Sequence, residues 1–167
     1  IGVARFAPGD EVFGMLPYPF GHGSHAEFVA APARLFTKKP TSVDHVQAGA
    51  LPLVSLTAWQ ALVENANLQP GQRVLVHAAA GGLGLVLCSW AARLGAQVIG
   101  TVSTEAKARL ARAHGCAQVI VTPDYRFADA VQQAVGGADV IVDGLGFDAQ
   151  RENLAALAPC GHWISLG

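Results

Sequence analysis

Residues 73–84 read Arg73-Val74-Leu75-Val76-His77-Ala78-Ala79-Ala80-Gly81-Gly82-Leu83-Gly84, and an apolar run continues to Leu94. This pattern is typical of a buried strand that turns through glycines into a helix. Bare backbone at Gly81 and Gly82 lets a pyrophosphate approach the chain closely, and Gly84 lets the helix pack against the strand. Free N–H groups at the start of the helix face the bound anion. The stretch therefore predicts a dinucleotide-binding turn.

The surroundings of this turn favour the same interpretation. The common fingerprint G-x-G-x-x-G has its first glycine where this chain has Ala79. The turn nevertheless follows a predicted strand and opens a helix, and a second strand, residues 97–101, follows at the interval of a βαβ unit. The alternative is a tight strand-to-helix turn that binds no ligand.

Apolar strands alternate with amphipathic helices from Arg73 onward. We expect strands near residues 73–77, 97–101, 118–121, 138–142 and 162–166, and helices near 83–94, 104–114, 126–135 and 148–158. This alternation predicts an α/β fold with a Rossmann-type, doubly wound parallel sheet covered on both faces. The ligand crevice should lie at the carboxyl ends of the strands, onto which residues 144–146 and 166–167 also open.

The first part of the chain has a different composition. Residues 1–39 are rich in Gly, Pro and aromatic residues, with short β-like pieces at 11–13, 26–29 and 34–36, too few to close a β domain. An apolar segment, residues 48–63, follows a capping stretch and is interrupted near Pro52, which predicts two consecutive helices. We divide the chain into residues 1–39 and a dinucleotide-binding domain over residues 40–167.

Composition excludes several classes of protein. With 51% hydrophobic residues, 14% charged residues and a net charge of -1, the chain has ample material for a core and no basic cluster for nucleic acid. Gly, Pro or charged residues cut every apolar run before it could span a bilayer, so we expect no membrane insertion. The three cysteines, Cys88, Cys116 and Cys160, form no C-x-x-C pair and are interpreted as buried reduced thiols of a cytoplasmic protein.

The end of the second predicted strand indicates which dinucleotide binds. NAD-preferring sites usually place Asp or Glu there, and this chain has Val102-Ser103-Thr104. A carboxylate would repel a 2′-phosphate, whereas a small polar residue followed by Lys107 and Arg109 can receive one. The missing acid therefore favours NADPH. The alternative for the two cations is an ordinary solvated helix face.

Together these residues resemble a known family, the zinc-independent branch of the medium-chain dehydrogenases/reductases, especially NADPH:quinone oxidoreductases and the enoyl reductases of polyketide synthases. The resemblance rests on the stretch His77–Gly84 and covers nearly the whole chain. Supporting matches are Gly9-Asp10-Glu11-Val12, Ala26-Glu27-Phe28-Val29, Leu56-Thr57-Ala58-Trp59 and Gln69–Val76. It implies that residues 1–39 are the end of a GroES-like β-rich domain and that residues 40–167 are an incomplete Rossmann domain.

The resemblance also assigns roles to individual residues. It places Ala80, Gly81, Gly82, Leu83 and Gly84 at the pyrophosphate, Ser103 and Lys107 at the adenosine 2′-phosphate, and Thr57, Leu145, Gly146 and Gly167 on the nicotinamide side. One position departs from the family: Thr122 stands where relatives often have a tyrosine that contacts the 2′-phosphate. No catalytic residue is assigned, although Tyr18 and His22 could border the substrate cleft.

The same resemblance argues against zinc. Zinc alcohol dehydrogenases have a cysteine ligand four residues before the threonine that matches Thr57, and this chain has Leu53 there. An aliphatic side chain cannot coordinate zinc, and no cysteine-rich structural zinc lobe is present. His22 and His25 lack a neighbouring Cys or carboxylate partner and are interpreted as loop residues. We predict no metal.

Without a metal, the implied chemistry is hydride transfer from NADPH to a small electron-poor acceptor such as a quinone, an enone or an enoyl thioester. A stand-alone reductase and a module of a polyketide synthase remain open, as does a non-catalytic relative of the lens-protein or vesicle-protein type. A zinc alcohol dehydrogenase is a weaker alternative. We further expect that the chain is part of a longer enzyme and that the whole protein is a homodimer, because family members pair through a sixth strand beyond residue 167.

Overall fold

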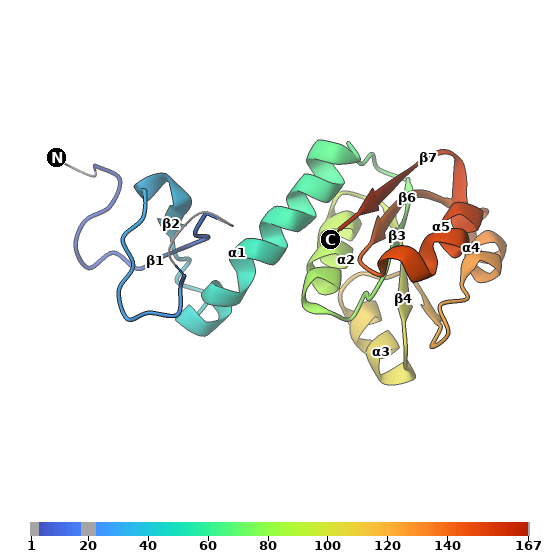
Figure 1. The fold of residues 1–167 in the computed structure, drawn as a ribbon, viewed down its shortest axis with the longest axis horizontal. Helices are drawn as coiled ribbons and strands as arrows, with labels where there is room; N and C mark the ends of the chain where they lie inside the picture. The colour runs from blue at the N-terminus through green and yellow to red at the C-terminus, as the bar shows by residue number, and fades with distance from the viewer. Residues whose placement is uncertain (1–3, 18–22, 167) are drawn as a thin grey trace. The chain divides into compact units, whose positions relative to one another are not determined.

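The computed structural model describes residues 4–17 and 23–166 of the 167-residue chain. The chain divides into two compact units, residues 1–54 and 55–167. The second unit contains the strands β3 to β7, of which β3, β4, β6 and β7 are labelled in Figure 1, and is the larger of the two.

The second unit is built on a five-stranded parallel sheet with the strand order β5-β4-β3-β6-β7. Its strands are β3 (Arg73–Val76), β4 (Gln97–Val102), β5 (Gln118–Val121), β6 (Ala138–Asp143) and β7 (Leu157–Ser165). The chain first runs outward from β3 to β5 and then returns to β6 on the other side of β3. The carboxyl ends of β3 and β6 therefore border the switch point at which open α/β sheets bind ligands.

Helices cover both faces of this sheet (Figure 1). On one face, α2 (Gly82–Arg93) and α3 (Glu105–Ala113) pack over Val74 and Val76 of β3. On the other face, α4 (Ala128–Val135) and α5 (Gln150–Ala156) pack over Leu75 and over Ile141 of β6. Successive residues of a strand point to opposite faces, so one central strand supplies both cores. The predicted doubly wound Rossmann-type sheet is confirmed.

Side-chain acceptors fix the starts of two helices. The Thr104 hydroxyl accepts a hydrogen bond from the backbone N–H of Lys107 at 3.3 Å, which caps α3. At α4, the carboxylate of Glu152 on α5 accepts from the backbone N–H groups of Phe127 and Ala128 at 2.7 and 2.8 Å. The second cap ties α4 to α5 on the same face of the sheet.

The turn between β3 and α2 shows why Ala79 can replace the first glycine of the fingerprint. The positive φ in this turn falls on Ala78, at 48°, and not on Ala79. The backbone N–H of Ala79 donates to the Thr101 carbonyl at 3.0 Å, so its methyl group faces β4. A Cβ atom at Gly100 of β4 would lie only 2.7 Å from that methyl group. The glycine in the neighbouring strand thus provides the space that the turn needs.

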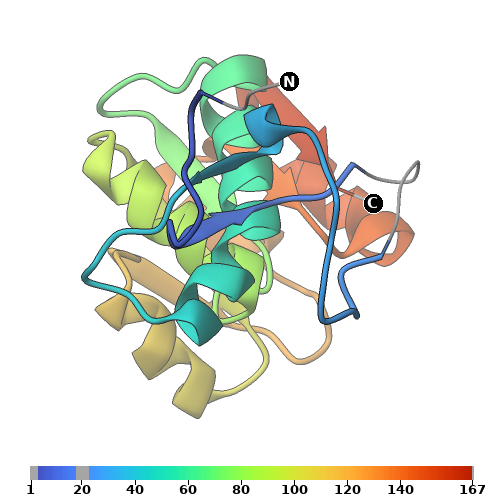
Figure 2. The ribbon, with the colours of Figure 1, turned by 90° about the vertical axis from the view of Figure 1, so that its left-hand side faces the viewer.

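The described part of the first unit contains one antiparallel strand pair, β1 (Val12–Gly14) with β2 (Phe36–Lys38), which run side by side in Figure 2. The expected strand at 11–13 forms one residue later. The expected strand at 34–36 is wrong in part, because Ala33–Leu35 is a 3-10 turn, η1, that leads into β2. No strand forms at 26–29, where the exposed residues find no neighbouring strand for hydrogen bonds among those described.

A single continuous helix replaces the two helices expected around Pro52. Helix α1 (His45–Trp59) runs through Pro52 and continues as the π-helical segment η2 (Gln60–Asn65). Proline removes only the hydrogen bond to the carbonyl one turn earlier, and the flanking turns keep theirs. The resulting 21-residue helix is long and apolar enough to cross a membrane by length and composition. The expectation that Gly, Pro or charged residues cut every apolar run before it could span a bilayer is therefore wrong for this segment. One helix of this kind is weak evidence for a membrane protein, because core helices pass the same test.

The cysteines only partly match the expectation of buried thiols. Cys88 and Cys116 are free and buried, with their sulfur atoms 3.2 Å apart between α2 and the loop before β5. Cys160 is free but exposed, because it lies in the irregular part of the edge strand β7 with a φ of 61°.

The amino end of the sheet is held by an ion pair that yields a pH prediction. Arg73 donates through Nε to Asp139 Oδ2 at 2.9 Å and through a terminal nitrogen to Oδ1, and only about a quarter of either side chain is exposed. The hydrogen bonds from Arg73 are the main cause that lowers the pKa of Asp139 below its ordinary 3.8. A depressed pKa gives stability that is present above the unfolded-state pKa and is lost as the pH falls through the folded-state value.

We predict that Asp139→Asn lowers the free energy of unfolding at pH 7 by about 1 to 3 kcal/mol, the scale of hydrogen bonds to a charged group. The deficit should shrink as the pH falls below 3.8. Urea unfolding at pH 7 and at acid pH measures both effects. Asp148→Asn, which removes an exposed carboxylate, is the control and should change little at either pH. A deficit that is equal at both pH values would contradict the charge argument.

The packing of Gly100 gives a second stability prediction. Gly100→Ala would bring a Cβ atom to 2.7 Å from Ala79 Cβ and 2.9 Å from Cys116 Sγ. We expect a loss of about 1 to 3 kcal/mol, as for other overpacked cores. Gly144→Ala is the matched control, because its Cβ would meet nothing within 4 Å. Thermal unfolding of the two variants would disprove the packing account if both had the same midpoint.

Candidate nucleotide-binding site

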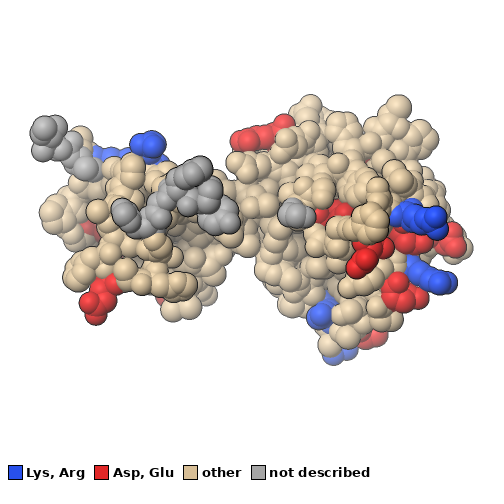
Figure 3. Space-filling model, viewed as in Figure 1, with Lys and Arg blue, Asp and Glu red and all other residues tan. Residues whose placement is uncertain are grey.

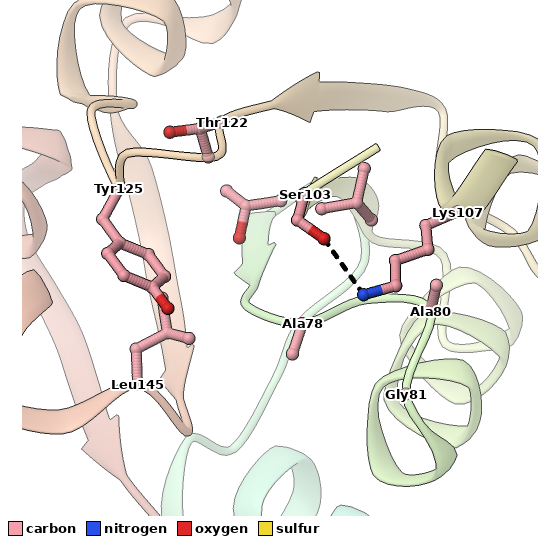
Figure 4. Close-up of a pocket in the computed structure, with 10 residues that line it drawn as sticks. Ala78, Ala80, Gly81, Ser103, Lys107, Thr122, Tyr125 and Leu145 are labelled. Carbon is pink, nitrogen blue, oxygen red and sulfur yellow. Dashed lines mark hydrogen bonds between the residues drawn. The ribbon is translucent and has the colours of Figure 1, made fainter. Parts of the chain in front are cut away.

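A cavity of about 250 Å³ opens at the carboxyl edge of the sheet in the second unit (Figure 4). It is lined by residues from the end of β4, from the loops that follow β3, β4, β5 and β6, and from the first turn of α3. The lining residues are Ala78, Ala80, Gly81, Thr101, Val102, Ser103, Lys107, Thr122, Tyr125 and Leu145. Five of the residues predicted for the cofactor, Ala80, Gly81, Ser103, Lys107 and Leu145, are thus brought together.

The glycine turn has the shape of a phosphate cradle. Gly81 is the N-cap of α2 and provides no side chain to satisfy the first N–H groups of the helix. A Cβ atom at Gly84 would lie 2.3 Å from the Ala78 carbonyl oxygen, so the helix can approach the turn only because this residue is glycine. A Cβ atom at Gly82 would meet nothing within 4 Å. Gly82, Leu83 and Gly84 form the first turn of α2, where an anion would be held by N–H groups and by the helix dipole.

Ser103 and Lys107 form the polar side of the cavity. The Lys107 ammonium group donates to the Ser103 hydroxyl at 3.0 Å, the contact drawn as a dashed line in Figure 4. Ser103 directly follows β4, which ends at Val102, and Lys107 lies in the first turn of α3, which Thr104 caps. Arg109, two residues further along α3, does not line the cavity. None of the ten lining residues is Asp or Glu.

The loop after β5 contributes both Thr122 and an aromatic residue, Tyr125, to the lining of the cavity. The Thr122 hydroxyl donates to Asp124 at 3.2 Å, so this side chain helps to shape its own loop. Three residues beyond Thr122, Tyr125 lines the cavity with a φ of 59° and remains 45% exposed. A tyrosine is therefore present at the cavity, at a later position than the resemblance predicts.

Buried polar side chains support the edge of the cavity. Asp143, at the end of β6, is completely buried. Its Oδ1 accepts from the backbone N–H groups of Leu145 and Gly146 at 2.7 and 3.2 Å. Its Oδ2 accepts from Asn153 Nδ2 at 3.0 Å and from Trp163 Nε1 at 3.2 Å. The carboxylate thereby holds the loop that contains the predicted nicotinamide-side residues.

His77 extends this set of contacts to the next strands. Its Nε2 lies 2.7 Å from Asn153 Oδ1 and its Nδ1 lies 2.8 Å from the Thr101 hydroxyl. The ring packs against Phe127 with a centroid distance of 4.6 Å. Burial is the main cause that lowers the pKa of His77 below its ordinary 6.5, so the neutral ring is favoured at neutral pH.

Other predicted residues lie elsewhere. Gly146 begins the 3-10 segment η3 (Gly146–Ala149) beside the cavity, with a φ of 74°. Thr57 is in α1, partly buried, and does not line the cavity. Gly167, Tyr18 and His22 lie outside the residues that the structure describes.

Sequence reasoning missed Ala78, Thr101, Val102 and Tyr125 as lining residues. The first three lie within two residues of a predicted residue, and the rule that strand ends meet at one edge of a parallel sheet could have found them. Tyr125 follows the third predicted strand by a few residues, so its aromatic side chain near the expected rim was also a usable signal.

The described residues offer no group of three or more His, Cys, Asp or Glu side chains that could hold a metal ion. The absence of zinc remains a prediction, based on Leu53 at the position where zinc alcohol dehydrogenases have a cysteine ligand. On the face of the second unit shown in Figure 3, basic and acidic side chains are interspersed.

Comparison with known proteins identifies the family. Residues 82–167, just over half of the chain, match the zinc-binding dehydrogenase family. The chain therefore belongs to this family. Within it, the chain is 39% identical over 168 residues to a 2-haloacrylate reductase from Burkholderia, covering 99% of this chain and 50% of that protein.

Solved structures agree with this placement. The quinone oxidoreductase of Pseudomonas syringae pv. tomato is 37% identical over 98% of this chain and 50% of its own, with a TM-score of 0.87. CurK enoyl reductase is 31% identical over 99% of this chain and 49% of its own, with a TM-score of 0.90. The Escherichia coli quinone oxidoreductase in complex with NADPH is 34% identical over 81% of this chain and 42% of its own, with a TM-score of 0.75. The predicted resemblance to quinone oxidoreductases and enoyl reductases is confirmed, and the chain spans about half of these proteins or less.

Proposed function

We propose that the protein is an NADPH-dependent oxidoreductase that reduces an electron-poor conjugated acceptor, of the quinone, enone or enoyl thioester class, without zinc. The observation that carries the proposal is the cavity that joins the glycine turn to Ser103 and Lys107. A pyrophosphate at the turn would place an adenosine ribose within reach of both side chains. The relatives named as reductases and oxidoreductases support the same class of reaction.

The choice of NADPH rests on charge at the adenosine end. No carboxylate lines the cavity to bind a free 2′-hydroxyl or to repel a 2′-phosphate. Lys107 supplies a positive charge and Ser103 a hydroxyl that can donate to a phosphate oxygen. The NADPH bound by the E. coli relative is consistent with this assignment.

When bound, the nicotinamide would supply the hydride, and the chain would bind and orient the cofactor. Ala80 to Gly84 would hold the pyrophosphate, and Thr57, Leu145, Gly146 and Gly167 would lie on the nicotinamide side, as the family resemblance implies. Residues 1–39 would be the end of a GroES-like domain, with residues 40–167 as the Rossmann domain. A homodimer in the cytoplasm is part of the same proposal.

The test is a calorimetric titration of the protein with NADPH and then with NADH, followed by an assay of NADPH oxidation with a quinone and an enoyl thioester. We expect tighter binding of NADPH and consumption of the cofactor with at least one acceptor. Binding without consumption would favour a non-catalytic relative. Tighter binding of NADH would refute the charge argument.

A single variant tests the proposed 2′-phosphate contact. Lys107→Ala should weaken NADPH binding by about 1 to 2 kcal/mol, the scale of one charge-assisted contact, and leave NADH binding nearly unchanged. Arg109→Ala is the matched control, because it removes the next positive charge on α3 without touching the cavity. Equal losses with both nucleotides would show that Lys107 acts elsewhere.

A further inference from the structure

The buried polar side chains behind the cavity form one continuous chain of hydrogen bonds. Thr101, His77, Asn153 and Asp143 are each at most 4% exposed. They come from β4, the end of β3, α5 and the end of β6, and neighbouring members lie 2.7 to 3.0 Å apart. Both ends of this series of hydrogen bonds reach the cavity. Thr101 lines the cavity directly, and Asp143 accepts from the backbone N–H group of Leu145, which also lines it.

The order of donors and acceptors in this chain is fixed. Asp143 accepts hydrogen bonds, so the amide nitrogen of Asn153 faces it and the amide oxygen faces His77. That oxygen requires a proton on His77 Nε2. A neutral ring then has an acceptor at Nδ1, to which the Thr101 hydroxyl donates. If any one of these groups were turned around, two donors or two acceptors would face each other.

Apart from the packing of Leu145 against the buried apolar residues, the loop at the far end is held mainly by Asp143 among the described contacts. Gly146 has a positive φ, η3 has no side-chain cap, and Phe147 next to it is 89% exposed. The Asp143 carboxylate accepts both backbone N–H groups of the Leu145–Gly146 turn and thereby sets its direction. A buried carboxylate is an expensive way to gain stability alone, because well-packed apolar groups often serve as well.

We propose that Asp143 and Asn153 are positioning residues, which hold the Leu145–Gly146 turn in the conformation that completes the cofactor cavity. His77 links them to the opposite wall at Thr101, so that both walls share one rigid support. The inference rests on the proposed function, because it takes the cavity to be the cofactor site. Neither Asp143 nor Asn153 lines the cavity, so both act through the turn.

The test exchanges the two residues. In Asn153→Asp, two carboxylates face each other. In Asp143→Asn, the new amide N–H groups face the N–H donors of Asn153 and Trp163. Each single change should weaken NADPH binding about tenfold, the scale of one or two buried hydrogen bonds. The double variant Asp143→Asn with Asn153→Asp restores the order of donors and acceptors between the two positions and leaves only the Trp163 indole without its acceptor. It should recover binding to within about threefold of the unchanged protein.

Two further readouts separate positioning from simple stability. In the free protein, hydrogen exchange at Leu145 and Gly146 should be faster in Asp143→Asn relative to exchange at residues 140–142. Asp139→Asn, at the other end of the same strand, is the matched control: it should lower the unfolding temperature and leave NADPH affinity unchanged. Trp163→Phe removes only one of the four described hydrogen bonds to the carboxylate and is the milder variant should Asp143→Asn not fold. It too should speed exchange at Leu145 and Gly146.

Variants that lower the unfolding temperature but bind NADPH as tightly as the unchanged protein would overturn the positioning role and leave the proposed function intact. A double variant no better than the single variants would also overturn it. Failure of the unchanged protein to bind either nucleotide would overturn the proposed function and this inference together.

Discussion

The close approach of α2 to the turn after β3 is the constraint on which the candidate site depends. Gly84 lies against the backbone of Ala78 and Ala79, where no side chain fits. This contact fixes where α2 begins and directs its first N–H groups toward the carboxyl edge of the sheet. Gly100 on β4 extends the same constraint, because it makes room for the Ala79 methyl group. The phosphate cradle therefore results from the close packing of three segments, which are the turn after β3, the start of α2, and β4.

The two ends of the sheet are stabilised in different ways, and this difference marks the functional edge. At the amino end, Arg73 and Asp139 form a partly exposed ion pair that joins β3 to β6. The buried polar residues among those described are His77, Thr101, Thr122, Asp143 and Asn153, and all five lie at or behind the carboxyl ends of the strands. Burying polar groups is costly unless each finds a partner, and none of the described buried atoms lacks one. The buried and fully hydrogen-bonded polar side chains are thus concentrated at the edge of the sheet where the ligand would bind.

The sequence allowed prediction of the parallel sheet because its strands are short apolar runs separated by amphipathic helices, and this pattern depends on local periodicity. It misled at residues 26–29, where β-forming residues have no partner strand, and at Pro52, where a long helix tolerates one missing hydrogen bond. The glycine turn, Ser103 and Lys107 could be predicted, because they follow from positions relative to two strands. The polar chain behind the cavity could not, because His77, Asn153 and Asp143 are distant in sequence and meet only through the fold.

The proposed preference for NADPH depends more on what the cavity lacks than on the cation it contains. Lys107 is exposed, and an exposed charge is screened by solvent, so its attraction for a phosphate is modest. A carboxylate at the end of β4 would act at closer range, since it would bind the ribose hydroxyls and repel a 2′-phosphate. Ser103 occupies that position instead, and its hydroxyl can form a hydrogen bond to a ribose with either a 2′-hydroxyl or a 2′-phosphate. In this proposal, selectivity would come from the loss of repulsion, and Lys107 would add a modest attraction for the phosphate.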